Sequence, residues 1–204
     1  MMEITTIHWI VFEVVLLAIC EFAPMSPFLA RKLCHIGSGI MMLQLDQTDY
    51  LARWFVYCVA FSSLVMVWEM GIPFQFRYAK VRDIGISLYL TIVVIFFYFQ
   101  VPLHIIQPVF FADPMGAIVG KGLSRLKLYN PTWIGTKTIG GTFAVFIACF
   151  LTLTFGTTPE KLLISILAAL FEGLSMEYDN LMIAAVVMCG YKSVESVPLW
   201  LYGH

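Results

Sequence analysis

The stretch IGISLYLTIVVIFFYFQV, residues 84–101, carries no charged side chain. About 20 apolar residues in a helix span the roughly 30 Å hydrocarbon core of a bilayer. Residues 139–158 are also uncharged, and residues 51–70 carry charges only near their ends, at Arg53 and Glu69. Because backbone that crosses hydrocarbon must satisfy its own hydrogen bonds, these stretches predict membrane-spanning helices.

The composition agrees with a membrane protein. Of the 204 residues, 60% are hydrophobic and 12% are charged, and that charged share is about half the share in an ordinary soluble domain. We therefore predict an all-α fold, a polytopic transmembrane helical bundle of about seven to eight segments in a single domain, residues 1–204. The expected segments are 4–22, 34–45, 51–70, 84–101, 104–112 with 114–123, 139–156, 162–176 and 181–191.

One predicted segment is interrupted at Asp113-Pro114. Proline lacks a backbone N–H and fits the first turn of a helix, so Asp113 is expected to cap a new helix that starts at Pro114. A broken helix at membrane depth is tolerated where it lines a cavity or packs on protein.

Charge and cysteine content give no reason to propose nucleic-acid binding, a disulfide framework or a zinc site. The formal net charge of −1 gives no basic footprint for nucleic acid. The five cysteines are scattered without a CxxC pair, so neither a disulfide framework nor a zinc site is indicated, and reduced thiols are expected.

The connections between the predicted segments alternate between basic and non-basic. One set of connections is basic, and the positive-inside rule assigns that set to the inner face of the membrane. The turn 177–181 falls on the same face and is acidic, so cations and carboxylates are expected to meet there. The basic set contains Arg31, Lys32, Arg77, Lys80, Arg82, Lys121, Arg125, Lys127 and Lys137.

Two groups of cations are candidates for binding an anion. Arg31 and His35 share a helical face as an i, i+4 pair, although Arg31 and Lys32 also fit the positive-inside rule alone. Lys137 lies between threonines and glycines at a predicted helix start, where backbone N–H groups can cradle phosphate. A lysine that reaches the membrane interface is the alternative for Lys137.

Carboxylates follow in the C-terminal part of the chain. Glu172 lies within an apolar segment, and Asp179 and Asn180 follow it in an acidic turn. Such oxygen ligands suit Mg²⁺. In one continuous helix Glu172 and Asp179 would lie about 10 Å apart along the axis, so we predict an unwound turn near Met176 that brings them together.

The order of these motifs resembles the polyprenol kinase family, which comprises phytol kinase, farnesol kinase and the membrane domain of dolichol kinase. The resemblance covers roughly residues 31–185. It is carried by Arg31-Lys32-x-x-His35, Asp113 with Gly120-Lys121, Tyr129-Asn130-Pro131, Lys137-Thr138-x-Gly140-Gly141-Thr142, Glu172 and Asp179-Asn180-Leu181.

The resemblance implies transfer of the γ-phosphoryl group of CTP, or of ATP or UTP, to the hydroxyl of a long isoprenoid alcohol, with Mg²⁺. Asp113, Glu172 and Asp179 are then the expected catalytic residues, and together with Asn180 they are the expected metal ligands. Which carboxylate acts as the base stays open. The expected nucleotide-binding residues are Arg31, Lys32, His35, Gly120, Lys121, Asn130, Lys137, Thr138, Gly140 and Gly141.

Two other functions fit the same residues. A CTP-dependent lipid-phosphate cytidylyltransferase would release pyrophosphate, and a small membrane transporter or lipid-binding protein would not need CTP with Mg²⁺. The expected partners are a nucleoside triphosphate, an isoprenoid alcohol and the lipid bilayer, without nucleic acid and with a homo-oligomer left open. A multi-pass location is expected, in the endoplasmic reticulum, a plastid or a prokaryotic plasma membrane, which the sequence does not distinguish.

Overall fold

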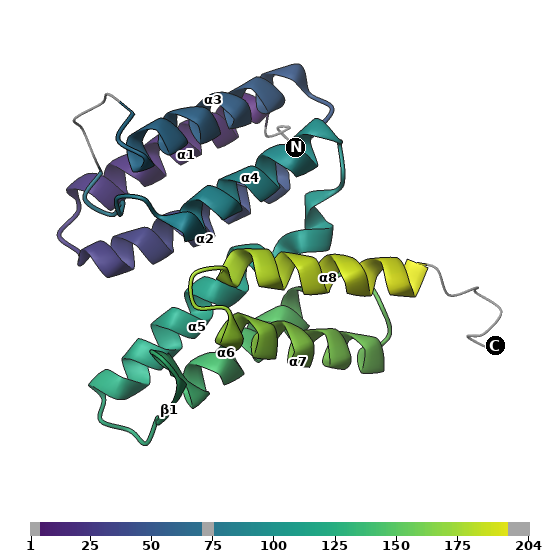
Figure 1. The fold of residues 1–204 in the computed structure, drawn as a ribbon. Coiled ribbons are helices and arrows are strands. Elements are labelled where there is room, and N and C mark those ends of the chain that lie inside the picture. Colours follow the sequence, from purple (N-terminus) through teal and green to yellow (C-terminus); the bar gives the residue numbers. More distant parts are fainter. Residues whose placement is uncertain (1–4, 71–75, 196–204) are drawn as a thin grey trace. The chain divides into compact units, whose positions relative to one another are not determined.

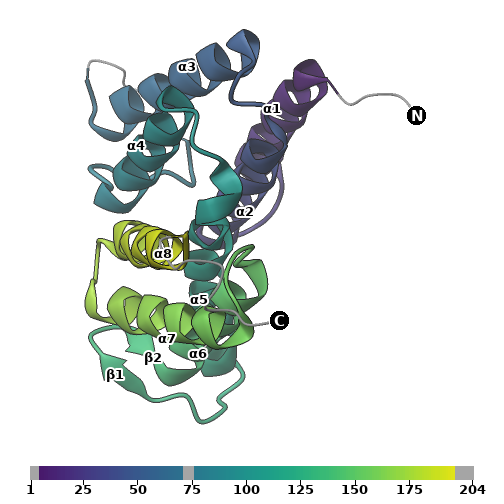
Figure 2. The same cartoon turned by 90° about the vertical axis from the view of Figure 1, so that its right-hand side faces the viewer.

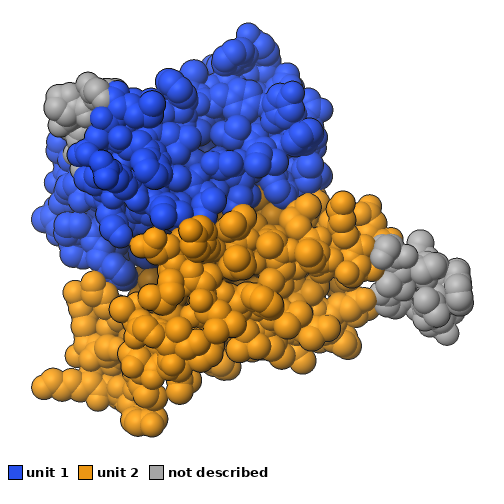
Figure 3. All heavy atoms as spheres, viewed as in Figure 1, with its two compact units in different colours: residues 1–103 blue, residues 104–204 orange. Residues whose placement is uncertain are grey.

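The computed structural model describes residues 5–70 and 76–195. The chain forms two compact units, residues 1–103 and 104–204, which Figure 3 colours separately. Ile4, the first residue of the predicted segment 4–22, lies outside the described residues. The prediction of a single domain over residues 1–204 stays a prediction.

Eight α-helices make up most of the described chain, which confirms the predicted all-α class (Figure 1). A short 3₁₀ helix, Leu103–Ile106, precedes α5, and a small antiparallel hairpin of β1 (Thr132–Ile134) and β2 (Lys137–Thr138) precedes α6. The α-helices are α1 (Thr6–Phe22), α2 (Pro27–Gln44), α3 (Tyr50–Val67), α4 (Ile84–Tyr98), α5 (Gln107–Arg125), α6 (Ile139–Thr152), α7 (Thr158–Leu174) and α8 (Asp179–Glu195).

The helices of unit 1 begin where the sequence supplies caps. Ser26 accepts a hydrogen bond from the backbone N–H of Leu29, and Pro27 follows in the first turn, where its missing N–H removes no helical bond. Asp49 caps α3 and Asp83 caps α4 in the same way. Within the unit, α1 packs against α2, and α3 packs against α4.

Unit 1 also buries polar groups. The Ser38 hydroxyl donates to Glu13 Oε1 at 2.6 Å, and both side chains are buried between α1 and α2. Arg77 donates to the backbone carbonyls of Cys20 and Ala23, which lie at the C-terminal end of α1. Helix C-termini leave carbonyls without helical partners, so Arg77 stabilises this end of α1.

In unit 2, α5 packs against α6 and α8, and α7 packs against both α6 and α8. The approach of α5 to α6 depends on glycines. A Cβ at Gly116 would lie 2.5 Å from Val145 Cγ2, and a Cβ at Gly141 would lie 2.9 Å from the Gly116 carbonyl. The GxxxG spacing of Gly116 and Gly120 therefore serves close helix packing in this structure.

The predicted interruption at Asp113-Pro114 is wrong. α5 runs without a break from Gln107 to Arg125, with Pro114 buried inside it and Ile106 at its N-cap. Pro108 takes the first-turn position that the sequence analysis gave to Pro114. An internal proline costs about 3 kcal/mol because the carbonyl four residues earlier loses its donor, and the packing of α5 on α6 and α8 offsets that cost.

Two helices in the described part of the chain are long and apolar enough to cross a membrane, Tyr50–Val67 and Leu103–Arg125. Ile84–Tyr98 and Ile139–Thr152 are apolar but shorter. Helices of this kind also occur in the cores of soluble proteins, so length and composition give weak evidence of membrane association.

Candidate functional site

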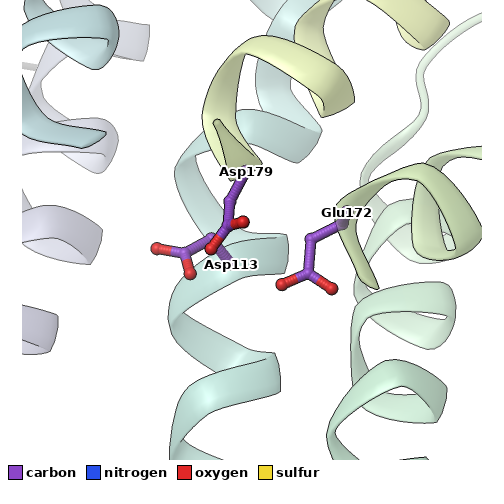
Figure 4. A group of neighbouring side chains, drawn as sticks. All are labelled: Asp113, Glu172 and Asp179. Carbon is purple, nitrogen blue, oxygen red and sulfur yellow. The ribbon is translucent and has the colours of Figure 1, made fainter. Parts of the chain in front are cut away.

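Three carboxylates from three helices of unit 2 lie together. Asp113 comes from the middle of α5, Glu172 from the last turn of α7 and Asp179 from the first turn of α8. One oxygen of each lies within 4.8 Å of the others. Figure 4 shows the three side chains reaching from their helices into the same space.

A break between α7 and α8 brings Glu172 and Asp179 together, as the sequence predicted. α7 ends at Leu174, α8 begins at Asp179, and Met176 has a positive φ of 54° in the turn between them. The Ser175 hydroxyl lies 3.0 Å from Asp179 Oδ1 and 2.9 Å from the Glu172 carbonyl, so it fixes the turn against both residues.

Lys137 forms ion pairs with two of the three carboxylates. Its ammonium contacts Glu172 Oε1 and lies 2.8 Å from Asp179 Oδ2. Burial by itself would lower the pKa of Lys137, but the attraction of Glu172 and Asp179 outweighs burial and holds that pKa above its ordinary value. Glu172, Asp179 and Lys137 together carry a net charge of −1 when all three are ionised, which favours an added cation.

The hairpin positions Lys137. Gly135 takes a φ of +52° in the turn between β1 and β2, and Figure 2 shows the hairpin beside the start of α6. The Trp133 indole donates to Thr142 Oγ1 at 2.9 Å and packs against Gly173, where a Cβ would clash with the ring. These contacts attach the hairpin to α6 and α7, next to Glu172.

At the start of α6, where the sequence predicts a phosphate cradle, side chains of the protein accept hydrogen bonds from the backbone amides. Thr138 caps the helix and accepts from the Gly141 N–H at 3.2 Å. Asn130 accepts from the Gly140 N–H at 2.9 Å and donates to the Gly120 carbonyl at 2.9 Å. Asn130 thus joins the end of α5 to the start of α6, and a role of this helix start in binding phosphate stays a prediction.

The other predicted residues of unit 2 lie on the same elements. Gly120 faces Thr138 and Gly141 across the α5–α6 contact, and Lys121 is exposed on α5. Asn180 is buried directly after Asp179 in the first turn of α8. Asn180 is therefore next to one of the three carboxylates in the sequence. Its predicted role as a metal ligand stays a prediction.

The predicted cations of α2 belong to unit 1. Arg31 pairs with Asp83 at 2.5 Å, and the His35 ring lies 4.5 Å from the ring of Tyr89. Lys32 is half-buried on the same helix. Their predicted convergence with the carboxylates of unit 2 stays a prediction.

The sequence analysis overlooked three residues that the structure singles out. Ser175 fixes the turn between two of the carboxylates, and Trp133 attaches the hairpin beside them. Glu13 is buried in α1 with Ser38. Glu13 had a signal in the sequence, because an ionisable residue within an apolar helix is a functional candidate by default. Trp133 and Ser175 had none without the fold.

Comparisons of this chain with protein families, with curated proteins and with solved structures found no match. The chemistry of the cluster and the motif order in the sequence are therefore the grounds for a function.

Proposed function

We propose that the chain is a membrane-embedded kinase that transfers the γ-phosphoryl group of CTP, or of another nucleoside triphosphate, to the hydroxyl of an isoprenoid alcohol. The observation that carries the proposal is the cluster of Asp113, Glu172, Asp179 and Lys137. These four residues are spread over residues 113–179, and each belongs to a motif that carries the resemblance to polyprenol kinases.

The cluster fits a divalent cation. Carboxylate oxygens are the hard ligands that Mg²⁺ takes, usually from one or two side chains together with water and phosphate oxygens. Oxygens on opposite sides of an octahedral Mg²⁺ lie about 4.2 Å apart, and the three carboxylates already supply oxygens within 4.8 Å of one another. To hold one ion, Asp113, Glu172 and Asp179 would move closer together, and the ion would share Glu172 and Asp179 with Lys137.

Phosphoryl transfer demands little covalent chemistry from a protein and depends on positioning and charge neutralisation. When bound, Mg²⁺ would offset the charge on the phosphate oxygens. Lys137 lies beside the carboxylates and supports that role as a second cation. The alcohol oxygen forms a bond to the γ-phosphorus, the bond from that phosphorus to the β-phosphate oxygen breaks, and a carboxylate of the cluster takes the hydroxyl proton. CDP leaves.

The proposed substrate requires access from a bilayer. The exposed face of α7 is apolar, with Leu163, Leu170 and Leu174 among its exposed side chains, and such a surface suits lipid better than water. We propose the multi-pass bundle of about seven to eight segments that the sequence predicts, in which the shorter helices α4 and α6 would cross together with α3 and α5. The alcohol would then present its hydroxyl to the cluster while its chain stays among apolar groups.

The nucleotide would bind to unit 2, where Lys137 and Lys121 are the proposed contacts to phosphate. A contribution of Arg31, Lys32 and His35, which lie in unit 1, stays a prediction from the sequence. The α5–α6 junction would also contact phosphate, through Gly120, Asn130, Thr138, Gly140 and Gly141. The hydrogen bonds that now join the end of α5 to the start of α6 would be exchanged for bonds to phosphate.

Product analysis tests the proposal. The purified protein in detergent is supplied with Mg²⁺, with CTP labelled on either the α- or the γ-phosphate, and with farnesol, geranylgeraniol, phytol or a dolichol. We expect the γ-label on the alcohol and the α-label in CDP.

Other products would contradict the kinase. Pyrophosphate together with the α-label on an added lipid phosphate would identify a cytidylyltransferase. Failure to bind or turn over any nucleotide would leave a transporter or a lipid-binding protein as the function.

A further inference from the structure

An apolar groove runs between α6 and α7 of unit 2. Its volume is about 310 Å³. Aromatic rings of Trp133, Phe143 and Phe146 form one part of its lining, and Ile166, Ala169 and Leu170 of α7 form another. None of the residues that line it is charged.

The groove lies along the start of α6 and the last part of α7, the same ends of these helices that carry Lys137 and Glu172. Ala169 precedes Glu172 by three residues on α7, so the two side chains lie on one face of the helix. Trp133 lies at this end of the groove, hydrogen-bonded to Thr142 and packed against Gly173, the neighbour of Glu172. An apolar chain in the groove could therefore place its polar end at the end of α7 where Glu172 and its partner Lys137 lie.

We infer that this groove binds the part of the alcohol's hydrocarbon chain next to its hydroxyl and favours alcohols whose chains are long enough to fill it. The inference rests on the proposed function. Ligand pockets commonly measure about 300–1,000 Å³, so the groove accommodates the first part of a long chain and leaves the rest in the bilayer. Lipid tails are as apolar as the groove, so the gain comes from holding the hydroxyl in position rather than from removal of water.

A second groove, between α7 and α8, is the natural comparison. It measures about 450 Å³ and includes the polar residues Glu160 and Ser193 in its lining. Glu160 lies in the first turn of α7, at the opposite end of that helix from Glu172. Leu167 lines this second groove, whereas Leu170 lines the first, and the two side chains are 37% and 42% exposed.

This pair of leucines allows a matched test. Leu170→Trp fills the α6–α7 groove, and Leu167→Trp adds the same bulk to the α7–α8 groove of the same helix. Loss of a few methylene contacts in a site lowers kcat/KM by about tenfold or more. We expect this drop for geranylgeraniol with Leu170→Trp, a smaller effect for the short alcohol prenol, and changes within about twofold for Leu167→Trp.

Photolabelling gives a second readout that does not need turnover. A diazirine analogue of geranylgeraniol should label peptides that contain Phe143 and Phe146, and Leu170→Trp should reduce this labelling. Label on Met182 or Cys189 of the α7–α8 groove, or labelling and kcat/KM that Leu170→Trp leaves unchanged, would overturn the inference. If the wild-type protein phosphorylates no alcohol, the kinase proposal fails, and the photolabel still decides whether the groove binds the chain.

Discussion

Asp179→Asn is expected to lower the rate of phosphoryl transfer by about a hundredfold or more at ordinary Mg²⁺, with little change in the folded state. The substitution keeps the size of the side chain and its position in the first turn of α8 but removes one charge from the cluster of Asp113, Glu172 and Asp179. Initial rates with geranylgeraniol and CTP over a range of Mg²⁺ concentrations measure the effect.

The Mg²⁺ dependence separates the two roles of Asp179. If Asp179 holds the ion, high Mg²⁺ restores part of the rate, and if it accepts the proton, no concentration restores it. Glu177→Gln is the matched control, because Glu177 is an exposed carboxylate two residues away in the same turn. Near-normal activity of Asp179→Asn, or an equal loss in Glu177→Gln, would contradict the assignment.

Lys137→Met is expected to lower both the rate of phosphoryl transfer and the free energy of unfolding. The variant loses a cation near the phosphate, which is typically worth about 10²–10³ in rate. It also leaves Glu172 and Asp179 partly buried without their counter-charge. Breaking a buried ion pair from one side costs about 3 kcal/mol, so the free energy of unfolding in detergent should fall by about that amount.

A double variant tests the electrostatic origin of that loss. The double variant Lys137→Met with Glu172→Gln removes one of the unpaired charges. Its free energy of unfolding should therefore be higher than that of Lys137→Met alone. Lys127→Met, at an exposed lysine before the hairpin, should stay within about 0.5 kcal/mol of the wild type. Equal stability of Lys137→Met and wild type would mean that the ion pairs contribute nothing measurable.

The helices were predictable because their hydrophobic stretches and their caps agree. Asp49 and Asp83 begin α3 and α4 within one residue of the expected segments, whereas α2 begins at Pro27, seven residues before the expected segment 34–45. The continuity of α5 was not predictable from local rules, because Pro114 disfavours a helix and only packing against α6 and α8 outweighs it. The hairpin escaped notice since strands of two and three residues leave no periodic pattern.

The carboxylate cluster was partly predictable. The turn near Met176 was predicted because the Asp179-Asn180 pair indicates a new helix start, and the structure confirms the turn. The pairing of Lys137 with Glu172 and Asp179 was not foreseen, because glycines and threonines around Lys137 indicate phosphate as a partner and do not reveal which carboxylates the fold brings near. The sequence also gave no sign that Asn130 and Thr138 bond the amides at the start of α6.

Binding of a divalent cation by the three carboxylates is the central claim, and electron paramagnetic resonance of Mn²⁺ as a substitute for Mg²⁺ tests it most directly. The protein in detergent is titrated with Mn²⁺ in the presence of CTP, and the signal of free Mn²⁺ is recorded. We expect depletion of the free ion by the wild type and by Glu177→Gln, and loss of that depletion when Asp113→Asn and Asp179→Asn are combined. Equal depletion by the combined variant and the wild type would contradict the claim.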